Sequence, residues 1–201
     1  LRSDIEIKEI NNLNSYSLFN IDYEGDYNVY LNDPRNINLG KKLITDKKIL
    51  IDKERLKEIN ETEYHEILIN HTTPYSPFDI LENKSLLLEN NFDNLNAIDW
   101  DKGCYVGQEI TARMKYRGLL KKKLYALKIK SGDVLEGDEL IVDNKKIGTI
   151  VSKANSNIFA ALNINFVNEI KNKNQNLVIN DSLSFDFLNW KFFSIKTYWN
   201  Y

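Results

Sequence analysis

The sequence has few cysteines, few prolines and no long apolar run. Cys104 is the only cysteine among 201 residues, so an internal disulfide and a self-contained four-cysteine metal or cluster site are both excluded. A single thiol can still be reactive. No apolar run approaches the roughly 20 residues that a membrane-spanning helix needs, and no stretch reads as a secretory signal. We therefore expect no membrane segment and a reducing setting, cytoplasmic or in an organelle matrix.

The overall charge excludes a field that would attract nucleic acid to the whole molecule. The net charge is −2 and the chain is 42% hydrophobic, which is typical of an ordinary folded protein. One local run is basic, with no acidic residue inside it: Arg113, Lys115, Arg117, Lys121, Lys122 and Lys123. Such a run attracts phosphate, a polyglutamate tail or RNA, and it is also typical of a solvated linker. We do not expect sequence-specific recognition of nucleic acid.

The first half of the chain mixes strand and helix patterns. Alternating or apolar stretches predict strands at residues 5–10, 15–21, 27–31 and 48–51. Helix-forming residues predict a helix within 52–70, and short helical turns are expected at 81–88 and 108–114. Two of the three prolines lie within residues 72–77, which predicts a loop there.

After about Leu120 short strands dominate the pattern. We expect strands near residues 123–129, 139–142, 146–152, 158–164, 177–179 and 184–187, with glycines between several of them. This series predicts a small β-barrel or sandwich. The predicted fold class is therefore α+β, with a first domain at 1–118, a boundary near residues 118–121 and a C-terminal β-barrel domain at 119–201.

The chemistry is expected around the only cysteine. Lys102 and Gly103 precede Cys104, and a nearby ammonium favours the thiolate, the nucleophilic and metal-binding form. Gly107, Gln108 and Glu109 follow and place an amide and a carboxylate near the same loop. A reactive or ligand-holding thiol is one interpretation. A small buried apolar side chain is the other.

The same stretch resembles a known family signature. Lys102-Gly103-Cys104-Tyr105-Val106-Gly107-Gln108-Glu109, followed by Ala112-Arg113 and Arg117-Gly118, is similar to the K-G-C-[YF]-x-G-Q-E…A-R…R-G pattern of the YgfZ family. Residues 88–93 resemble the segment before that pattern. Asp33-Pro34-Arg35 with Leu39-Gly40 resembles the D-P-R…L-G element, and residues 148–152 with 160–162 resemble the family's C-terminal barrel.

The resemblance implies a folate-binding domain like that of the glycine-cleavage T-protein (GcvT), and a role in making or repairing iron–sulfur enzymes. It also implies that the family chain begins upstream of Leu1. Cys104 and Lys102 would be the reactive residues and tetrahydrofolate the cofactor, with iron–sulfur enzymes or assembly factors as partners. The cofactor-binding candidates are Glu89, Asn91, Gln108, Glu109, Arg113 and Arg117, with Glu89 at the pterin edge, where a carboxylate accepts two hydrogen bonds.

Two other functions stay open at this stage. One is a folate-dependent aminomethyltransferase, and the other is a non-enzymatic module that acts with tRNA-modifying enzymes through the basic run. The two histidines, His65 and His71, stand six residues apart without acidic neighbours at ligand spacing. We assign no metal site to them and expect a surface or helix-capping role. Trp100 is expected behind the cysteine loop, and Trp190 and Trp199 in the barrel core or a C-terminal cover.

Overall fold

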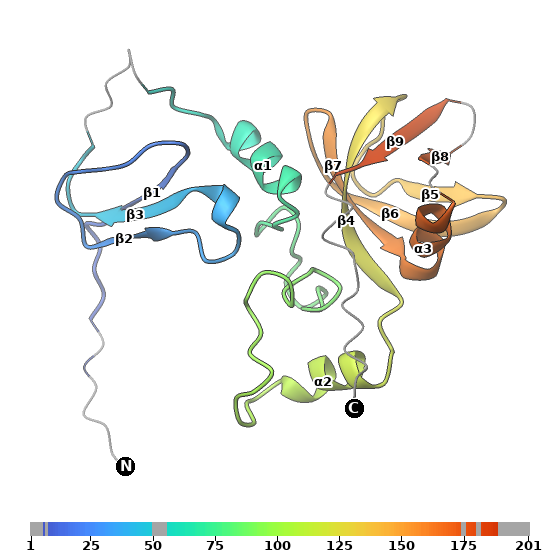
Figure 1. The fold of residues 1–201 in the computed structure, drawn as a ribbon, viewed down its shortest axis with the longest axis horizontal. Helices are drawn as coiled ribbons and strands as arrows, with labels where there is room; N and C mark the ends of the chain where they lie inside the picture. Colours follow the sequence, from blue (N-terminus) through green and yellow to red (C-terminus); the bar gives the residue numbers. More distant parts are fainter. Residues whose placement is uncertain (1–5, 7, 50–55, 174–175, 180–181, 189–201) are drawn as a thin grey trace. The chain divides into compact units, whose positions relative to one another are not determined.

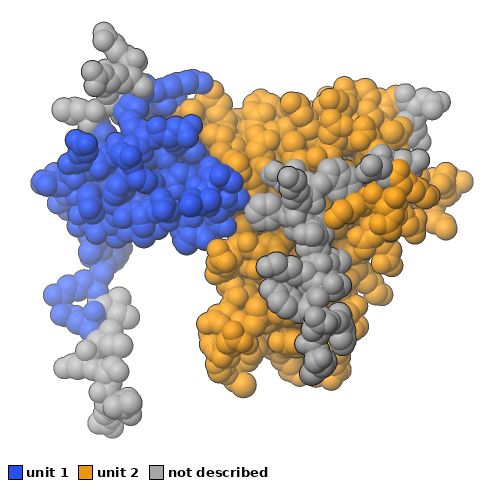
Figure 2. Space-filling model, in the orientation of Figure 1, with its two compact units in different colours: residues 1–58 blue, residues 59–201 orange. Residues whose placement is uncertain are grey.

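A computed structural model describes residues 6, 8–49, 56–173, 176–179 and 182–188. The chain divides into two compact units, residues 1–58 and residues 59–201, which Figure 2 shows in different colours. The predicted boundary near residues 118–121 falls inside the second unit and stays a prediction. Each unit is described by itself below.

The first unit contains a three-stranded antiparallel sheet in the order β1-β3-β2. Its strands are β1 (Asn14–Leu18), β2 (Val29–Asn32) and β3 (Lys41–Thr45). β3 pairs with both neighbours, so that Leu43 lies opposite Tyr16 on one side and Tyr30 on the other. Leu43 and Leu39 are buried and form the centre of this unit.

A tight turn after β2 uses the Asp33-Pro34-Arg35 element noted in the sequence. The buried Asp33 carboxylate accepts hydrogen bonds from Arg35 Nε at 3.0 Å and Nη2 at 2.7 Å. Burial alone would raise the pKa of Asp33, but the hydrogen bonds and charge of Arg35 and the charge of Lys42 outweigh it and hold this pKa below its ordinary value. Gly40 follows with a φ of 71°, where a Cβ would meet the Leu18 carbonyl oxygen at 2.0 Å, so this position requires glycine.

The second unit is built on a six-stranded antiparallel sheet in the order β5-β6-β7-β4-β9-β8 (Figure 1). The edge strands β5 and β8 also contact each other, so the sheet is nearly closed into a barrel. This confirms the prediction of a C-terminal barrel in its coarser form. The strands are β4 (Lys122–Ser131), β5 (Glu139–Val142), β6 (Lys145–Ala154), β7 (Asn157–Asn163), β8 (Leu177–Ile179) and β9 (Leu183–Phe187).

Strand β4 is buried on both faces, and its alternating side chains serve two different cores. Tyr125 and Leu127 point into the main core of the sheet, which also contains Ile158 and Phe185. Leu124 and Ala126 point to the other face and pack with Phe159, Ala154 and Ile69. The strand predicted near residues 123–129 is confirmed, and its successive residues face opposite sides.

Two helices cover parts of this sheet. Helix α1 (Glu61–Asn70) begins at a capping box in which Asn60 and Glu63 exchange hydrogen bonds between side chain and backbone. Its Ile69 packs onto the core that contains Phe159. Helix α3 (Ile164–Asn172) begins directly after β7, where the Asn163 side chain accepts from two backbone N–H groups.

Several predicted elements differ from the structure. Among the described residues of the segment 5–10, positions 6 and 8–10 form no strand, and Ile10 is exposed. Residues 48–49 are not a strand, while 50–51 lie outside the described residues; the strand stands earlier, as β3. Of the helix predicted within 52–70, residues 52–55 lie outside the described residues, residues 56–60 are not helical, and α1 begins at Glu61, where Asn60 caps it. Residues 81–88 contain turns, and the Ser85 N–H donates to the Leu81 carbonyl at 3.0 Å, so the short helical turns expected there are confirmed. The prediction omitted α3.

Candidate functional site

The cysteine loop rests on a small apolar core of its own. Leu88, Ile98 and Met114 are buried together, with Trp100 and Leu120 packed against them. Met114 belongs to α2 (Gln108–Tyr116), the helix that directly follows the loop. Both ends of residues 99–107 are therefore attached to one core, through Ile98 and Trp100 on one side and α2 on the other.

Cys104 lies exposed in this loop. The interpretation as a buried apolar side chain is therefore wrong. At Gly103 a Cβ would meet nothing within 4 Å, so the described chain leaves the backbone beside the thiol open. Gly107 ends the loop in the left-handed region with a φ of 88°, which favours glycine and sets the direction of α2. The sequence thus holds the thiol at the surface in a turn with a defined geometry.

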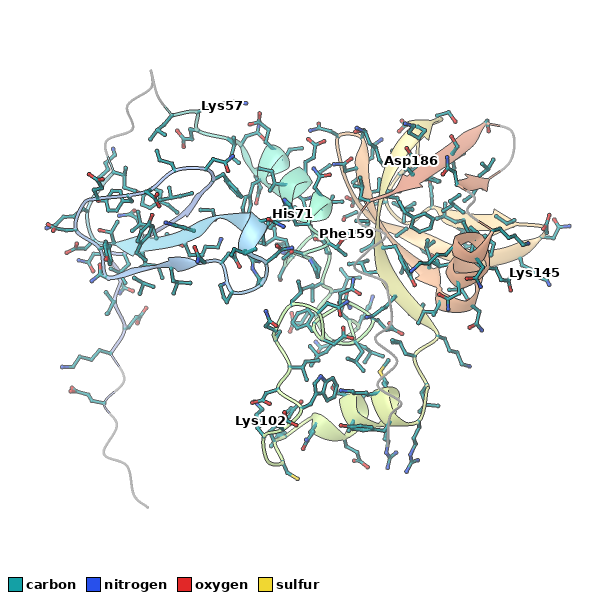
Figure 3. The ribbon with its side chains drawn as sticks, viewed as in Figure 1. Lys57, His71, Lys102, Lys145, Phe159 and Asp186 are labelled. Carbon is teal, nitrogen blue, oxygen red and sulfur yellow. The ribbon has the colours of Figure 1, made fainter. Side chains whose placement is uncertain are left out.

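The neighbours of the thiol have separate contacts. The Lys102 ammonium lies 4.8 Å from the centre of the Tyr105 ring, and Figure 3 shows Lys102 at the outer end of the loop before α2. Gln108 Oε1 accepts from the Tyr105 backbone N–H at 3.4 Å, while the Gln108 N–H donates to the Tyr105 carbonyl at 3.2 Å. Gln108 therefore supports the loop that carries Cys104.

An aromatic and cationic cluster lies behind the loop. The Lys115 ammonium is 3.5 Å from the centre of the Trp100 ring, and Tyr116 meets the same ring edge to face at 6.3 Å. Partial burial lowers the pKa of Lys115, and the charges of Asp93 and Asp101 oppose this shift only in part. The expected position of Trp100 behind the cysteine loop fits this packing. Trp190 and Trp199 lie outside the described residues.

The remaining candidates on α2 lie on its solvent side. Glu109 and Arg113 form an ion pair one turn apart. Arg117 caps the helix through its backbone N–H, which donates to the Arg113 carbonyl at 3.0 Å. All three side chains are exposed. Their assignment to a cofactor stays a prediction.

Glu89 and Asn91 belong to a run of turns that is bound to the start of β4. The Glu89 carboxylate is about four-fifths buried and lies 3.3 Å from Lys122 Nζ. Asn91 is buried with a positive φ of 63°, and its Nδ2 donates to the Leu124 carbonyl at 2.7 Å. The Asn91 Oδ1 atom is buried without a hydrogen-bond partner. It is therefore an unused acceptor, two residues after Glu89 in the sequence.

The predicted site residues thus form two groups. Lys102, Cys104 and Gln108 share the loop with the start of α2, and Glu109, Arg113 and Arg117 follow along that helix. Glu89 and Asn91 lie against β4. No hydrogen bond or ion pair joins the two groups among the described residues. In the same part of the chain no cluster of three or more His, Cys, Asp or Glu side chains could hold a metal, and no helix there is long and apolar enough to cross a membrane.

The sequence analysis missed a buried polar network around His65. Its Nε2 lies 3.0 Å from Asp79 Oδ1, and the same carboxylate accepts from the Ser152 hydroxyl and from the Tyr75 N–H at 2.6 Å. The expectation of a surface role is wrong for His65, which stands three and four residues before the buried Leu68 and Ile69 on one helix face. His71, by contrast, ends the helix as its C-cap residue, as predicted.

This network resembles a hydrolase triad in composition but not in arrangement. Asp79 lies between the serine and the histidine, so the Ser152 hydroxyl donates to a carboxylate and not to an imidazole base. All three side chains are buried. The arrangement connects α1, the following loop and β6, and its role is therefore structural.

Comparison with known proteins places the chain beside a set of assembly factors. No protein-family model matches it. It is 31% identical over 166 residues to "Iron-sulfur cluster assembly factor IBA57 homolog, mitochondrial" of Dictyostelium discoideum, a match that covers 73% of this chain and 41% of the relative. It is 32% identical over 101 residues to the Mus musculus factor, covering 49% of this chain and 28% of that protein.

A third relative, "Iron-sulfur cluster assembly factor IBA57, mitochondrial" of Saccharomyces cerevisiae, is 36% identical over 89 residues, which are 44% of this chain and 17% of the relative. The chain thus spans about two fifths or less of the length of these three relatives. The names of these relatives refer to iron–sulfur cluster assembly, the process that the YgfZ resemblance implied. None of the three names mentions YgfZ, so membership of the YgfZ family stays a prediction. This chain is similar to mitochondrial iron–sulfur cluster assembly factors.

Proposed function

We propose that this chain is the part of an iron–sulfur cluster assembly factor that presents a thiol to a cluster or to a protein that carries one. The observation that carries the proposal is the exposed Cys104, held between an apolar core and the start of α2. The names of the relatives support the same process. They also support the organelle-matrix setting, with the mitochondrial matrix as the proposed location.

The chemistry of such a thiol is ligand exchange at iron. Cys104 loses its proton to solvent, and its thiolate replaces another ligand on a cluster iron, with no change in oxidation state. A single thiol cannot complete the ligand set of a cluster. The other thiolates must therefore come from a partner, and an exposed loop allows this because a buried one would be out of reach.

Tetrahydrofolate is the proposed second ligand, at the run of turns that is bound to the start of β4. Glu89 offers a mostly buried carboxylate, and Asn91 offers a buried acceptor oxygen without a partner. These two groups suit the amino and N–H donors of a pterin, since both can only accept at these oxygens. When bound, the folate would supply a one-carbon or redox-active pterin group, while the residues of this chain bind and orient it.

The thiol proposal is tested in Dictyostelium discoideum cells that lack their own relative. The cells receive a hybrid in which the matched part of their relative is replaced by the matched 73% of this chain, with Cys104 intact or changed by Cys104→Ser. We expect the intact hybrid to restore the activity of iron–sulfur enzymes and the serine variant to fail, while Lys145→Ala on β6 serves as the matched surface control. Equal rescue by the serine variant would refute the proposal.

The folate proposal is tested separately by calorimetry. Tetrahydrofolate is titrated into the chain and into its Glu89→Gln variant, with Glu139→Gln on β5 as the control. Loss of a charge-assisted hydrogen bond should weaken binding about tenfold or more. Unchanged affinity in Glu89→Gln, or no binding to any of the three proteins, would remove folate from the account and leave the thiol proposal untouched.

A further inference from the structure

Helix α2 has two sides with different degrees of burial. Its inner side is buried through Thr111 and Met114, the second of which belongs to the core beneath the loop. Its outer side exposes the aliphatic Ile110, at 60%, and Val106, in the turn just before the helix, is fully exposed, at 103%. The inner side already anchors the helix, so the outer aliphatic residues are not needed to hold it in place.

Two outer side chains of α2 and the residue at its C-terminal end lie along one side of the helix. Ile110, Arg113 and Arg117 stand three and four residues apart, a spacing that places them in line on one side of a helix. Val106 precedes them in the turn that leads into α2, next to the cysteine loop. We name these four residues, Val106, Ile110, Arg113 and Arg117, the α2 face. It begins with two aliphatic residues and ends with two cations.

The surroundings of the α2 face have a charge opposite in sign to that of the whole chain. Residues 102–123 include seven basic side chains and only Glu109 as an acidic one, whereas the complete chain has a net charge of −2. Lys122 and Lys123 are paired with Glu89 and Asp93, which lie outside this range, and the other five basic side chains remain. Glu109 is already paired with Arg113. Within the described residues Arg117 and Lys121 form no ion pair. The face therefore joins an aliphatic end to a rim of positive charge.

We propose that the α2 face is the docking surface for an acidic protein that carries an iron–sulfur cluster. Its aliphatic residues would be covered at the centre of the contact, and its cations would meet the acidic rim of the partner. The cluster-bearing nature of the partner rests on the proposed function of Cys104. The acidic and partly apolar character of the partner rests on the α2 face alone.

Two other occupants fit the face less well. Nucleic acid is contacted through cations, amides and aromatic rings that stack on bases. Tyr116 is an exposed aromatic ring on α2, but it packs edge to face against Trp100, and Val106 and Ile110 offer none of these groups. A lipid surface requires an apolar face separated from the charged one. Here Arg113 and Arg117 lie in line with Ile110, and insertion of the aliphatic residues would draw the Glu109–Arg113 pair into the bilayer. The surface of a folded protein can offer apolar contacts and acidic side chains next to each other, and so match both the aliphatic residues and the cations of the α2 face.

The test measures binding of an acidic [2Fe–2S] ferredoxin by calorimetry, in its apo and holo forms, with cytochrome c as a basic protein for comparison. We expect the chain to bind both forms of ferredoxin and not cytochrome c. Ile110→Asp and Arg117→Glu should each weaken binding about tenfold, whereas the charge reversal Lys145→Glu on the exposed end of β6 should leave it unchanged. Because both substituted residues are exposed, thermal unfolding should be the same for all variants.

The same experiment separates this inference from the proposed function. Docking should persist with apo ferredoxin and with Cys104→Ser, because the α2 face needs neither the cluster nor the thiol. Absence of ferredoxin binding, or equal weakening by all three charge variants, would overturn the proposal. The same variants are also tested for binding to a single-stranded RNA and to vesicles with anionic lipid. If ferredoxin does not bind, but the RNA or the vesicles bind in a way that depends on Ile110, the docking proposal is overturned in favour of that ligand.

Discussion

The six-stranded sheet and the cysteine loop belong to one unit but use their side chains in opposite ways. In the sheet, β4 buries four successive residues from Leu124 to Leu127 between two cores. In the loop and α2, Cys104, Val106 and Ile110 are exposed, and only a small core holds the segment from beneath. Stability is concentrated in the sheet, and the groups available to a partner are concentrated in the loop.

The largest predicted contrast comes from truncating one side chain in each region. Phe159 of β7, labelled in Figure 3, is fully buried and packs with Ile69 of α1 and with Leu124 of β4. We expect Phe159→Ala to lower the free energy of unfolding by about 3–5 kcal/mol, because it leaves a cavity between two well-packed elements. Val106→Ala, at a fully exposed position, should change it by less than about 0.5 kcal/mol. Urea unfolding of both variants checks the contrast, and comparable losses would show that the loop is part of the stabilising core.

A second contrast concerns buried and exposed acidic residues. Asp79→Ala removes the common acceptor of His65, Ser152 and the Tyr75 N–H, so we expect a loss of at least about 3 kcal/mol from the buried groups left without a partner. The control is Asp186→Ala on β9, whose partly exposed pair with Lys130 is at the surface and should contribute about 0–1 kcal/mol. Equal effects in urea unfolding would mean that the network around Asp79 does not connect α1 to the sheet.

The smallest contrast appears at high pH. Burial raises the pKa of Tyr125 in the sheet core to about 12. A phenol whose pKa is raised by folding stabilises the fold fully below its unfolded pKa of about 10, and this contribution is lost as the pH rises from there toward the folded pKa. Stability should therefore fall between about pH 10 and 12, by at most roughly 1.4 kcal/mol per pH unit from this group. Tyr125→Phe should remove this pH-dependent loss of stability, as measured by urea unfolding between about pH 10 and 12. If the variant shows the same loss, the loss does not come from Tyr125.

The sequence predicted the sheet better than the elements before it, and the reason is physical. Each strand from β4 to β9 carries at least one buried apolar residue, and in β4 the two alternating sets, Leu124 with Ala126 and Tyr125 with Leu127, are both apolar. β3 was not predicted because it begins with two lysines, which interrupt the apolar pattern of a strand. Leu43, which follows them, is nevertheless fully buried. α3 was not predicted because it follows β7 without a connecting loop. Asn163 is both the last residue of β7 and the N-cap residue of α3.

The candidate site was only partly predictable. The spacing around Gly103 and Gly107 predicted a cysteine loop, and Cys104 is exposed there. The ion pairs that fix the surrounding turns join residues far apart in the sequence, such as Lys123 with Asp93 at 3.2 Å and Lys122 with Glu89 at 3.3 Å. No local sequence pattern predicts ion pairs between such distant residues. Likewise, the buried role of His65 depends on Asp79 and Ser152, which lie 14 and 87 residues away.

The central claim is that Cys104 reaches a cluster held by another protein, and its alkylation rate tests this most directly. Cys104 is the only cysteine of the chain, so mass spectrometry after anaerobic iodoacetamide treatment reports on one thiol. We expect the holo form of the ferredoxin probe to protect Cys104 from alkylation, the apo form to protect it less, and the visible spectrum of the cluster to change only with Cys104 present. Equal alkylation rates with both forms, and the same spectrum with Cys104→Ser, would contradict the account.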